Sequence, residues 1–232
     1  MEQPTSFSRP QVSLATDCVV FGFDGYRIKV LLIKRKINPF LGMWAFPGGF
    51  MLEHETLNEC AVRELHEETG LHPYFLEQFH AFSDIDRDPR GRVVSVAYFC
   101  LMPTAQVQGG SDAEEAQWFD IHELPEMAFD HKEIFNMAQS RLRERIYFEP
   151  IAFGLLDKKF TMSELQRVYE VVLDVQFDRR NFQKKMLASN IIVPLDEQRR
   201  SENGPSRPAT LYSFKKEDYH SFKNSMGFSL EF

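Results

Sequence analysis

The sequence has few cysteines and no long apolar run. Its three cysteines, Cys18, Cys60 and Cys100, are widely spaced and flanked by apolar residues. This pattern predicts reduced core thiols and neither a disulfide framework nor a metal set. The first residues, MEQPTSFSRPQVS, lack the basic stretch and apolar core of a signal peptide, and no stretch of about 18 apolar residues occurs anywhere. We therefore expect a soluble, cytoplasmic protein with no membrane partner.

Several catalytic motifs are missing as well. The seven histidines show no metal spacing such as His-Glu-x-x-His. The sequence also contains no Gly-x-Ser-x-Gly, no Walker loop and no Cys-x-x-Cys. These absences exclude zinc, serine hydrolase and P-loop chemistry.

The charge is distributed unevenly along the chain. The composition is ordinary for a globular protein of 232 residues, with 43% hydrophobic and 26% charged residues, and the net charge of −7 argues against a generally basic nucleic-acid binder. However, residues 1–149 carry 14 basic and 23 acidic side chains, whereas residues 150–232 carry 13 basic and 11 acidic ones. This asymmetry predicts two domains with different partners, which we place at residues 1–148 and 149–232.

The stretch GFMLEHETLNECAVRELHEETGL, residues 49–71, predicts one amphipathic helix. A capping box is formed by Thr56 with Glu59. An apolar residue stands at every fourth position, at Leu57, Ala61 and Leu65, and Gly70 ends the helix.

Three glutamates stand opposite this apolar stripe. Glu64, Glu67 and Glu68 are spaced i, i+3 and i+4, so their carboxylates crowd one face of the helix. Three like charges repel unless a cation neutralises them. Because carboxylate oxygen is a hard ligand, the expected ion is Mg²⁺ or Mn²⁺, which completes its shell with water and substrate phosphate.

The same stretch resembles the Nudix box, with no departure at any signature position: Gly49, Glu55, Arg63, Glu64, Leu65, Glu67, Glu68, Gly70 and Leu71. A solvated acidic helix face would account for the glutamates but not for the arginine and the framing glycines. The resemblance implies an α/β (α+β) fold, a mixed-sheet α/β/α sandwich. It also implies a pyrophosphohydrolase in which Glu64, Glu67 and Glu68 hold the metal, with Arg63 and Glu55 forming an internal pair that orients the helix.

The segments around this helix predict a sheet and a second helix. Strands are expected at residues 17–23, 27–34, 75–82, 93–102 and 117–119, a loop at 38–49 and a helix at 133–145. His131, near the start of that helix, is interpreted as a structural hydrogen-bonding group. Trp44 and Phe46 are interpreted as packing residues.

Five residues outside the three glutamates are candidates for substrate binding. Gly48 and Gly49 could offer backbone N–H groups to an anion. The charged loop 84–92 is either an exposed salt-bridged turn or a source of phosphate contacts through Arg90 or Arg92. Glu115 lies in a region where Nudix enzymes often carry a further acid that acts as base or metal ligand.

The second part predicts short helices followed by a hairpin. A second capping box, Thr161 with Glu164, opens a helix, and Asp178 caps the next one, RRNFQKKMLAS. Two β-like runs, 191–195 and 210–214, flank a polar loop that includes Arg207. This order is typical of a winged helix-turn-helix domain, whose DNA contacts we expect from Arg179, Arg180, Asn181, Lys184, Lys185, Arg199 and Arg200. A helical interaction or dimerisation module is the alternative.

The complete arrangement resembles the NrtR family of Nudix-related transcriptional regulators. The segments FDHKEIFNMA, FEPIAFGLL, KKFTMSELQRVYE and DRRNFQKKML carry the resemblance in the second half. It implies a homodimer that binds operator DNA and senses ADP-ribose, another nucleotide sugar or a free sugar. Two alternatives remain: a plain Nudix pyrophosphohydrolase with a C-terminal assembly domain, and a sugar-responsive regulator without hydrolase activity.

Overall fold

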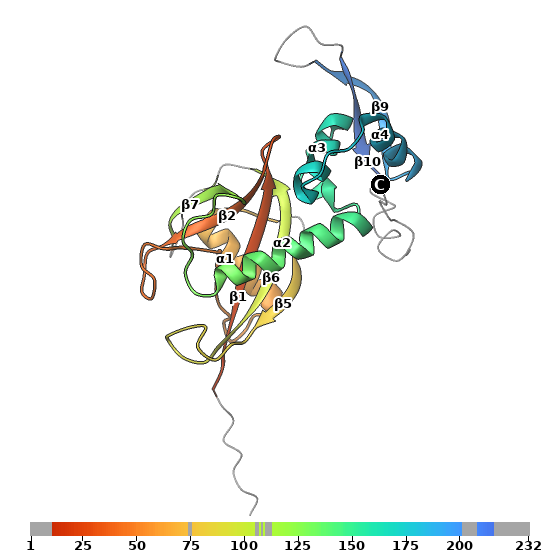
Figure 1. The fold of residues 1–232 in the computed structure, drawn as a ribbon. Helices are drawn as coiled ribbons and strands as arrows, with labels where there is room; N and C mark the ends of the chain where they lie inside the picture. The colour runs from red at the N-terminus through yellow and green to blue at the C-terminus, as the bar shows by residue number, and fades with distance from the viewer. Residues whose placement is uncertain are drawn as a thin grey trace, which may run out of the picture.

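The computed structural model describes residues 11–73, 76–104, 107, 109, 113–200 and 208–215. A seven-stranded mixed sheet forms the larger part (Figure 1). Its strands are β1 (Ser13–Phe23), β2 (Ile28–Arg35), β3 (Trp44–Ala45), β4 (Gly48–Phe50), β5 (Glu77–Phe82), β6 (Val93–Pro103) and β7 (Ala113–Asp120). The central strand β1 runs parallel to β6 and antiparallel to β2 and β4.

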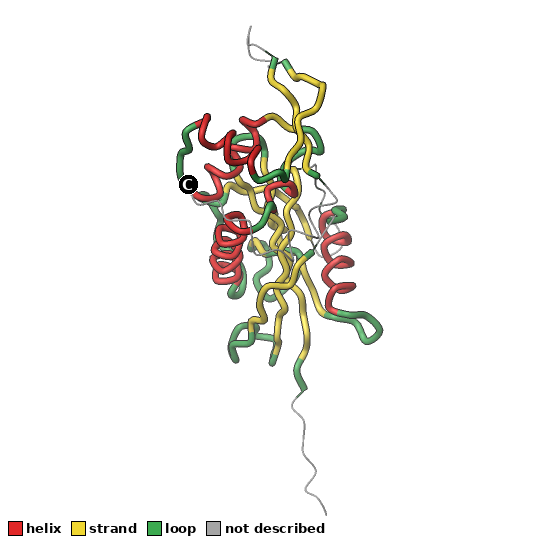
Figure 2. Tube along the Cα trace, turned by 90° about the vertical axis from the view of Figure 1, so that its right-hand side faces the viewer, coloured by secondary structure: helices red, strands yellow, loops and turns green. Residues whose placement is uncertain are grey.

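One helix covers each face of this sheet. The helices α1 (Leu57–Thr69) and α2 (His131–Phe148) lie on opposite sides of the strands, which Figure 2 shows edge-on. Because side chains alternate along a strand, Cys18 and Val20 of β1 pack in the cluster with α1, and Val19 and Phe21 pack in the cluster with α2. Burial on both faces explains the nearly continuous apolar sequence of β1 and confirms the predicted sandwich.

The remaining elements form a winged helix-turn-helix. A 3₁₀ helix, η1 (Ile151–Gly154), leads through β8 (Phe160–Thr161) to the helices α3 (Met162–Leu173) and α4 (Arg179–Ala188). The strands β9 (Ile192–Arg199) and β10 (Ala209–Phe214) form the wing, and β10 also pairs with β8. The predicted order of helices and hairpin is therefore confirmed.

Helix ends were predicted best where local capping fixes them. Both capping boxes are present, at Thr56 with Glu59 and at Thr161 with Glu164. Gly70 ends α1 in the left-handed conformation, with φ of 73°. No helix within the described ranges is both long and apolar enough to cross a membrane.

Several predicted boundaries were wrong because tertiary pairing extends the elements. β1 begins at Ser13, not at Asp17, since its first residues pair with β4 and β6. β7 begins at Ala113 because it pairs with β2 along its length. β3 and β4 form inside the predicted loop 38–49, α2 extends from 131 to 148, and β9 continues to Arg199 inside the predicted polar loop.

The two halves of the chain share one hydrophobic core. A single cluster of buried side chains includes Val19 and Phe21 of the sheet, Ile146 of α2, and Leu165 and Tyr169 of α3. Apolar packing, in addition to the chain connection, therefore joins the winged unit to the sheet and to α2.

Candidate functional site

The acidic face of α1 packs against the glycines of β4. A Cβ atom built on Gly49 would lie 2.3 Å from Oε1 of Glu64, and one built on Gly48 would lie 2.0 Å from the backbone oxygen of Thr16. The Gly48 N–H donates a hydrogen bond of 2.8 Å to Oε2 of Glu68. The two glycines therefore allow strand and helix to approach closely.

This arrangement corrects two expectations. Glu68 is only 3% exposed and Glu64 also packs on β4, so these two carboxylates face the sheet and only Glu67 of the three is open to solvent. The Gly48 N–H is occupied by Glu68 and does not face an open anion site. Neither contact could be read from the helical spacing, because both depend on how α1 docks on β4.

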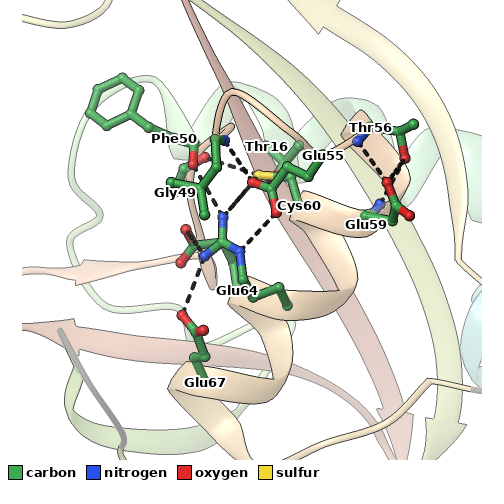
Figure 3. A network of polar contacts seen from close by, with 11 residues as sticks. Thr16, Gly49, Phe50, Glu55, Thr56, Glu59, Cys60, Glu64 and Glu67 are labelled. Carbon is green, nitrogen blue, oxygen red and sulfur yellow. Dashed lines mark hydrogen bonds and ion pairs between the residues drawn. The ribbon is translucent and has the colours of Figure 1, made fainter.

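Arg63 connects the acidic side chains. Its Nε and Nη2 atoms donate to both carboxylate oxygens of Glu55, at 2.9 and 2.6 Å, which confirms the predicted pair. Its Nη1 atom lies 2.7 Å from Glu64 and 3.3 Å from Glu67. Figure 3 shows Glu55, Glu64 and Glu67 gathered on this side of α1. The positive charge of one guanidinium group thus lies next to the negative charges of three carboxylates.

The charges in this group shift the pKa values in different directions. Desolvation by burial raises the pKa of Glu64; Arg63 opposes this shift, and the negative charges of Glu67 and Glu55 add to it. Hydrogen bonds from Arg63 lower the pKa of Glu55 to about 2, and the same pairing raises the pKa of Arg63. Of Glu55 and Glu64, Glu64 is therefore the one whose ionised form is disfavoured, and burial is the main reason.

The donor set suits a hard divalent cation. Glu64 and Glu67 both contact the same guanidinium, so a positive charge already lies beside the two side chains. Glu67 has a 45% exposed side chain and can reach an ion from solvent. Over the described ranges, no group of three acidic, histidine or cysteine side chains is arranged as a metal site. The three glutamates of the box do not converge, because Glu64 and Glu67 contact Arg63 and Glu68 contacts Gly48. Metal binding would require Arg63 to release at least one of them.

The arginines of the loop 84–92 point in different directions. Arg90 is held by Asp88 at 2.7 Å, and its guanidinium lies 4.7 Å from the ring centroid of Phe50, the residue after Gly49. Arg92 donates to the backbone oxygens of Ser83 and Asp84, at 2.7 and 3.1 Å. Arg90 is therefore close to the box, whereas Arg92 stabilises its own loop.

Glu115 lies on β7, opposite Lys34 of β2 in the strand register, and is exposed. Its neighbour Glu114 makes the ion pair with Lys34, at 3.7 Å. The contacts of β7 include α1, so this strand runs beside the box helix.

Sequence reasoning missed two buried charged residues of this region. Arg87 and Asp17 have exposed fractions of 9% and 7%, and both lie in a polar group that includes His131. Arg87 could not be distinguished from Arg90 and Arg92 in the charged loop, because its partner Asp130 is 43 residues away. The interpretation of His131 as a structural hydrogen-bonding group is confirmed, since its Nδ1 accepts the Phe46 N–H at 2.9 Å.

The helix α4 presents a basic outer face. Its inner face is fixed by the buried residues Phe182 and Met186, and Asp178 caps its start by accepting from the Asn181 N–H at 2.9 Å. The predicted DNA contacts on the outer face are exposed except for the half-buried Lys185: Arg179, Arg180, Asn181, Lys184 and Lys185.

The arginines expected to contact DNA from the wing have different surroundings. Arg199 pairs with Glu164 at 2.8 Å and donates to the Lys159 backbone oxygen, so it is turned toward α3. Arg200 is exposed just after β9. Arg207 lies outside the described residues.

Two family models match consecutive parts of the chain. The NUDIX domain model matches residues 12–137, and the NrtR DNA-binding winged helix domain model matches residues 152–214. The ADPR responsive transcriptional repressor NtrR of Acinetobacter baylyi is 32% identical over 215 residues, which cover 90% of this chain and 85% of the relative. The chain belongs to the NrtR family.

A solved NrtR structure has the same architecture. Shewanella oneidensis NrtR, crystallised with a 27mer DNA, is 31% identical to this chain, with a TM-score of 0.81 over 94% of this chain and 99% of the other. The ADP-ribose pyrophosphatase of Methanocaldococcus jannaschii is 48% identical over 106 residues, or 46% of this chain and 63% of that enzyme. This NrtR-family chain is therefore similar both to regulators and to a Nudix enzyme.

Proposed function

We propose that this protein is a transcriptional regulator that binds operator DNA through its winged helix and ADP-ribose through its Nudix domain. The observation that carries the proposal is the presence, in one folded chain, of a complete Nudix box and an exposed basic helix α4. The Acinetobacter relative named as ADPR responsive, which matches along 90% of this chain, supports the choice of effector.

The Nudix domain is proposed to bind Mg²⁺ or Mn²⁺ and to retain hydrolysis of the diphosphate. Glu64, Glu67 and Glu68 would hold the ion. When bound, the ion would act as a Lewis acid on the diphosphate and lower the pKa of the attacking water. Arg63, held by Glu55, positions the glutamates and limits their repulsion. The intact box and the similarity to an ADP-ribose pyrophosphatase support this part.

The diphosphate would lie between the box and the neighbouring loops. Arg90 is the stronger candidate for a phosphate contact, because it stacks on Phe50 next to Gly49. The Gly49 N–H is proposed as a second donor and Glu115 as a further acid near the ligand. Arg92 would have to leave the carbonyls of Ser83 and Asp84 to take part.

The DNA-binding surface is proposed to be the outer face of α4 together with the wing. A helix fits the major groove, where arginine and asparagine side chains read base edges and lysines neutralise phosphates. A homodimer would place two such helices on a two-fold symmetric operator.

The DNA-binding part is tested by the double variant Arg180→Ala/Lys184→Ala. Its affinity for duplex DNA should fall, and the slope of log affinity against log salt should decrease by about 1 for each phosphate that is no longer neutralised. The matched control is Lys132→Ala/Arg141→Ala, which removes the same charge from exposed positions on α2. Equal DNA binding by both double variants would favour a plain Nudix hydrolase with an assembly domain.

Hydrolysis is tested separately with Glu67→Gln. This variant should lose Mg²⁺-dependent cleavage of ADP-ribose, whereas the exposed Glu53→Gln should keep it. Cleavage that survives in Glu67→Gln would refute the metal assignment. Absence of cleavage in the unaltered protein, with ADP-ribose binding retained, would indicate a regulator without hydrolase activity.

A further inference from the structure

A buried polar group surrounds the start of α2. Arg87 makes a bidentate pair with Asp130, at 2.8 and 2.6 Å, and its Nη2 lies 3.5 Å from Asp17. Asp17 also accepts from the Ser95 hydroxyl at 2.5 Å and faces Nε2 of His131 at 3.3 Å. Separating such buried partners is costly, so this group holds β1, β6, the loop 84–92 and α2 in one arrangement.

The same group is joined to the ligand side of the sheet. The Phe46 N–H donates to Nδ1 of His131, and the two rings stack with centroids 5.4 Å apart. Asp17 is paired in register with Gly48, whose N–H is bound to Glu68 of the Nudix box. A displacement of β4 by a ligand would therefore reach His131 through two short connections.

The other end of α2 contacts the winged unit. Nε of Arg143 donates to the Val172 backbone oxygen, near the end of α3, at 3.1 Å. Arg145 is buried and pairs with Glu77 of β5 and with Glu149. Figure 1 shows α2 running from the sheet toward α3. Because a helix of 18 residues is stiff along its axis, its two ends move together.

The joint between the two units also has an open part. A cleft of about 470 Å³ lies between the two units there, lined by Arg27, Asp120 and His122 of the sheet unit and by Glu170 and Asp174 of the winged unit, among others. A hydrogen bond crosses beside it, from Arg167 to the Tyr26 backbone oxygen at 3.3 Å. This cleft leaves space beside α3 in which the winged unit can move relative to the sheet.

We propose that α2 transmits effector binding to the winged helix. His131 is the positioning residue at the end of α2 near the ligand site, and Arg143 makes the contact at the end near the winged unit. This inference rests on the proposed function, in which ADP-ribose controls DNA binding. The effector would shift β4, β4 would shift the start of α2, and α2 would turn α3 and α4 relative to the sheet.

The test compares three quantities in the full-length protein: ADP-ribose affinity, DNA affinity, and the ratio of DNA affinities with and without saturating ADP-ribose. In the unaltered protein this ratio should differ from one by about 5- to 150-fold. In Arg143→Met both separate affinities should stay within about twofold, and the ratio should fall toward one. The matched control is Arg141→Met, because Arg141 is exposed on the same helix and pairs only with its neighbour Glu144 among the contacts that the structure describes.

A second variant tests the other end of α2. His131→Asn keeps an acceptor for the Phe46 N–H but cannot reach Asp17, so it should also reduce the ratio. If it folds less well, its DNA affinity without effector falls, whereas a loss of transmission changes only the ratio. The double variant Arg143→Met/His131→Asn should change the ratio of DNA affinities little more than either single variant does, because both substitutions interrupt the same connection.

The outcomes separate the two proposals. A ratio of one in the unaltered protein would overturn the proposed function and this inference together. A ratio well above or below one that persists unchanged in Arg143→Met and His131→Asn would overturn the role of α2 alone.

Discussion

Arg63 meets both carboxylate oxygens of Glu55, at 2.9 and 2.6 Å, although eight residues separate them in the sequence. The bidentate geometry fixes the guanidinium so that its remaining nitrogen faces Glu64 and Glu67. Glu55 is therefore not a candidate ligand in this arrangement but the residue that keeps Arg63 in place.

The first prediction concerns Glu55→Gln. Without the Glu55 carboxylate, Arg63 should pair more closely with Glu64 and Glu67 and compete with a divalent cation. Mn²⁺ affinity should fall by about 10- to 100-fold, as is usual for residues that orient metal ligands. Electron paramagnetic resonance of bound Mn²⁺ measures this directly. The control Glu53→Gln removes an exposed carboxylate from the same loop and should leave Mn²⁺ affinity unchanged.

The second prediction is that alanine substitutions at the two glycines of β4 have different effects. In Gly48→Ala the new methyl group meets the backbone of Thr16, which cannot move without breaking the strand pairing, so the free energy of unfolding should fall by about 3 kcal/mol. In Gly49→Ala it meets the carboxylate of Glu64, which can rotate away. Urea unfolding should therefore show Gly48→Ala as the less stable variant, whereas Mn²⁺ affinity should fall in Gly49→Ala, which stays folded. Equal stability of the two variants would contradict this assignment.

The sequence predicts contacts that are close along the chain and misses those made by folding. The ends of α1, its capping box and the Glu55–Arg63 pair lie within 15 residues of one another; local rules predicted the ends and the capping box, and the resemblance to the Nudix box implied the pair. The burial of Glu68 was missed because it depends on the docking of α1 against β4. Among three arginines in one loop, the buried one is Arg87, and its partner Asp130 is distant in sequence.

The third prediction is a pH dependence of stability that depends on Asp17. Desolvation by burial raises the pKa of Asp17, but the attraction and hydrogen bond of His131, the charge of Arg87 and the Ser95 hydroxyl outweigh it, so the pKa is lowered to about 2. Its ordinary value is 3.8. The ionised group therefore stabilises the fold above about pH 4, and this contribution, about 2 kcal/mol, is lost as the pH falls toward 2.

Urea unfolding of Asp17→Asn at several pH values tests this. The variant should be less stable than the unaltered protein at pH 6, and the difference should shrink as the pH approaches 2. Asp86→Asn, at an exposed position, serves as the control and should show no such narrowing. A difference that stays constant down to pH 2 would refute the low pKa.

The last prediction concerns the hydroxyl group of Tyr169 in α3. Tyr169 is fully buried and packs edge-on against Phe182 of α4. Among the residues that the structure describes, none offers its hydroxyl a hydrogen-bond partner. A buried hydroxyl without a partner costs free energy, so Tyr169→Phe should stabilise the protein by about 1 kcal/mol and raise Tm by about 2–4 °C. Tyr212→Phe, a second tyrosine of the winged unit with 7% exposure, is the control and should change Tm little. A lower Tm for Tyr169→Phe would instead mean that a buried water binds the hydroxyl, because removing a satisfied group leaves that water without its partner.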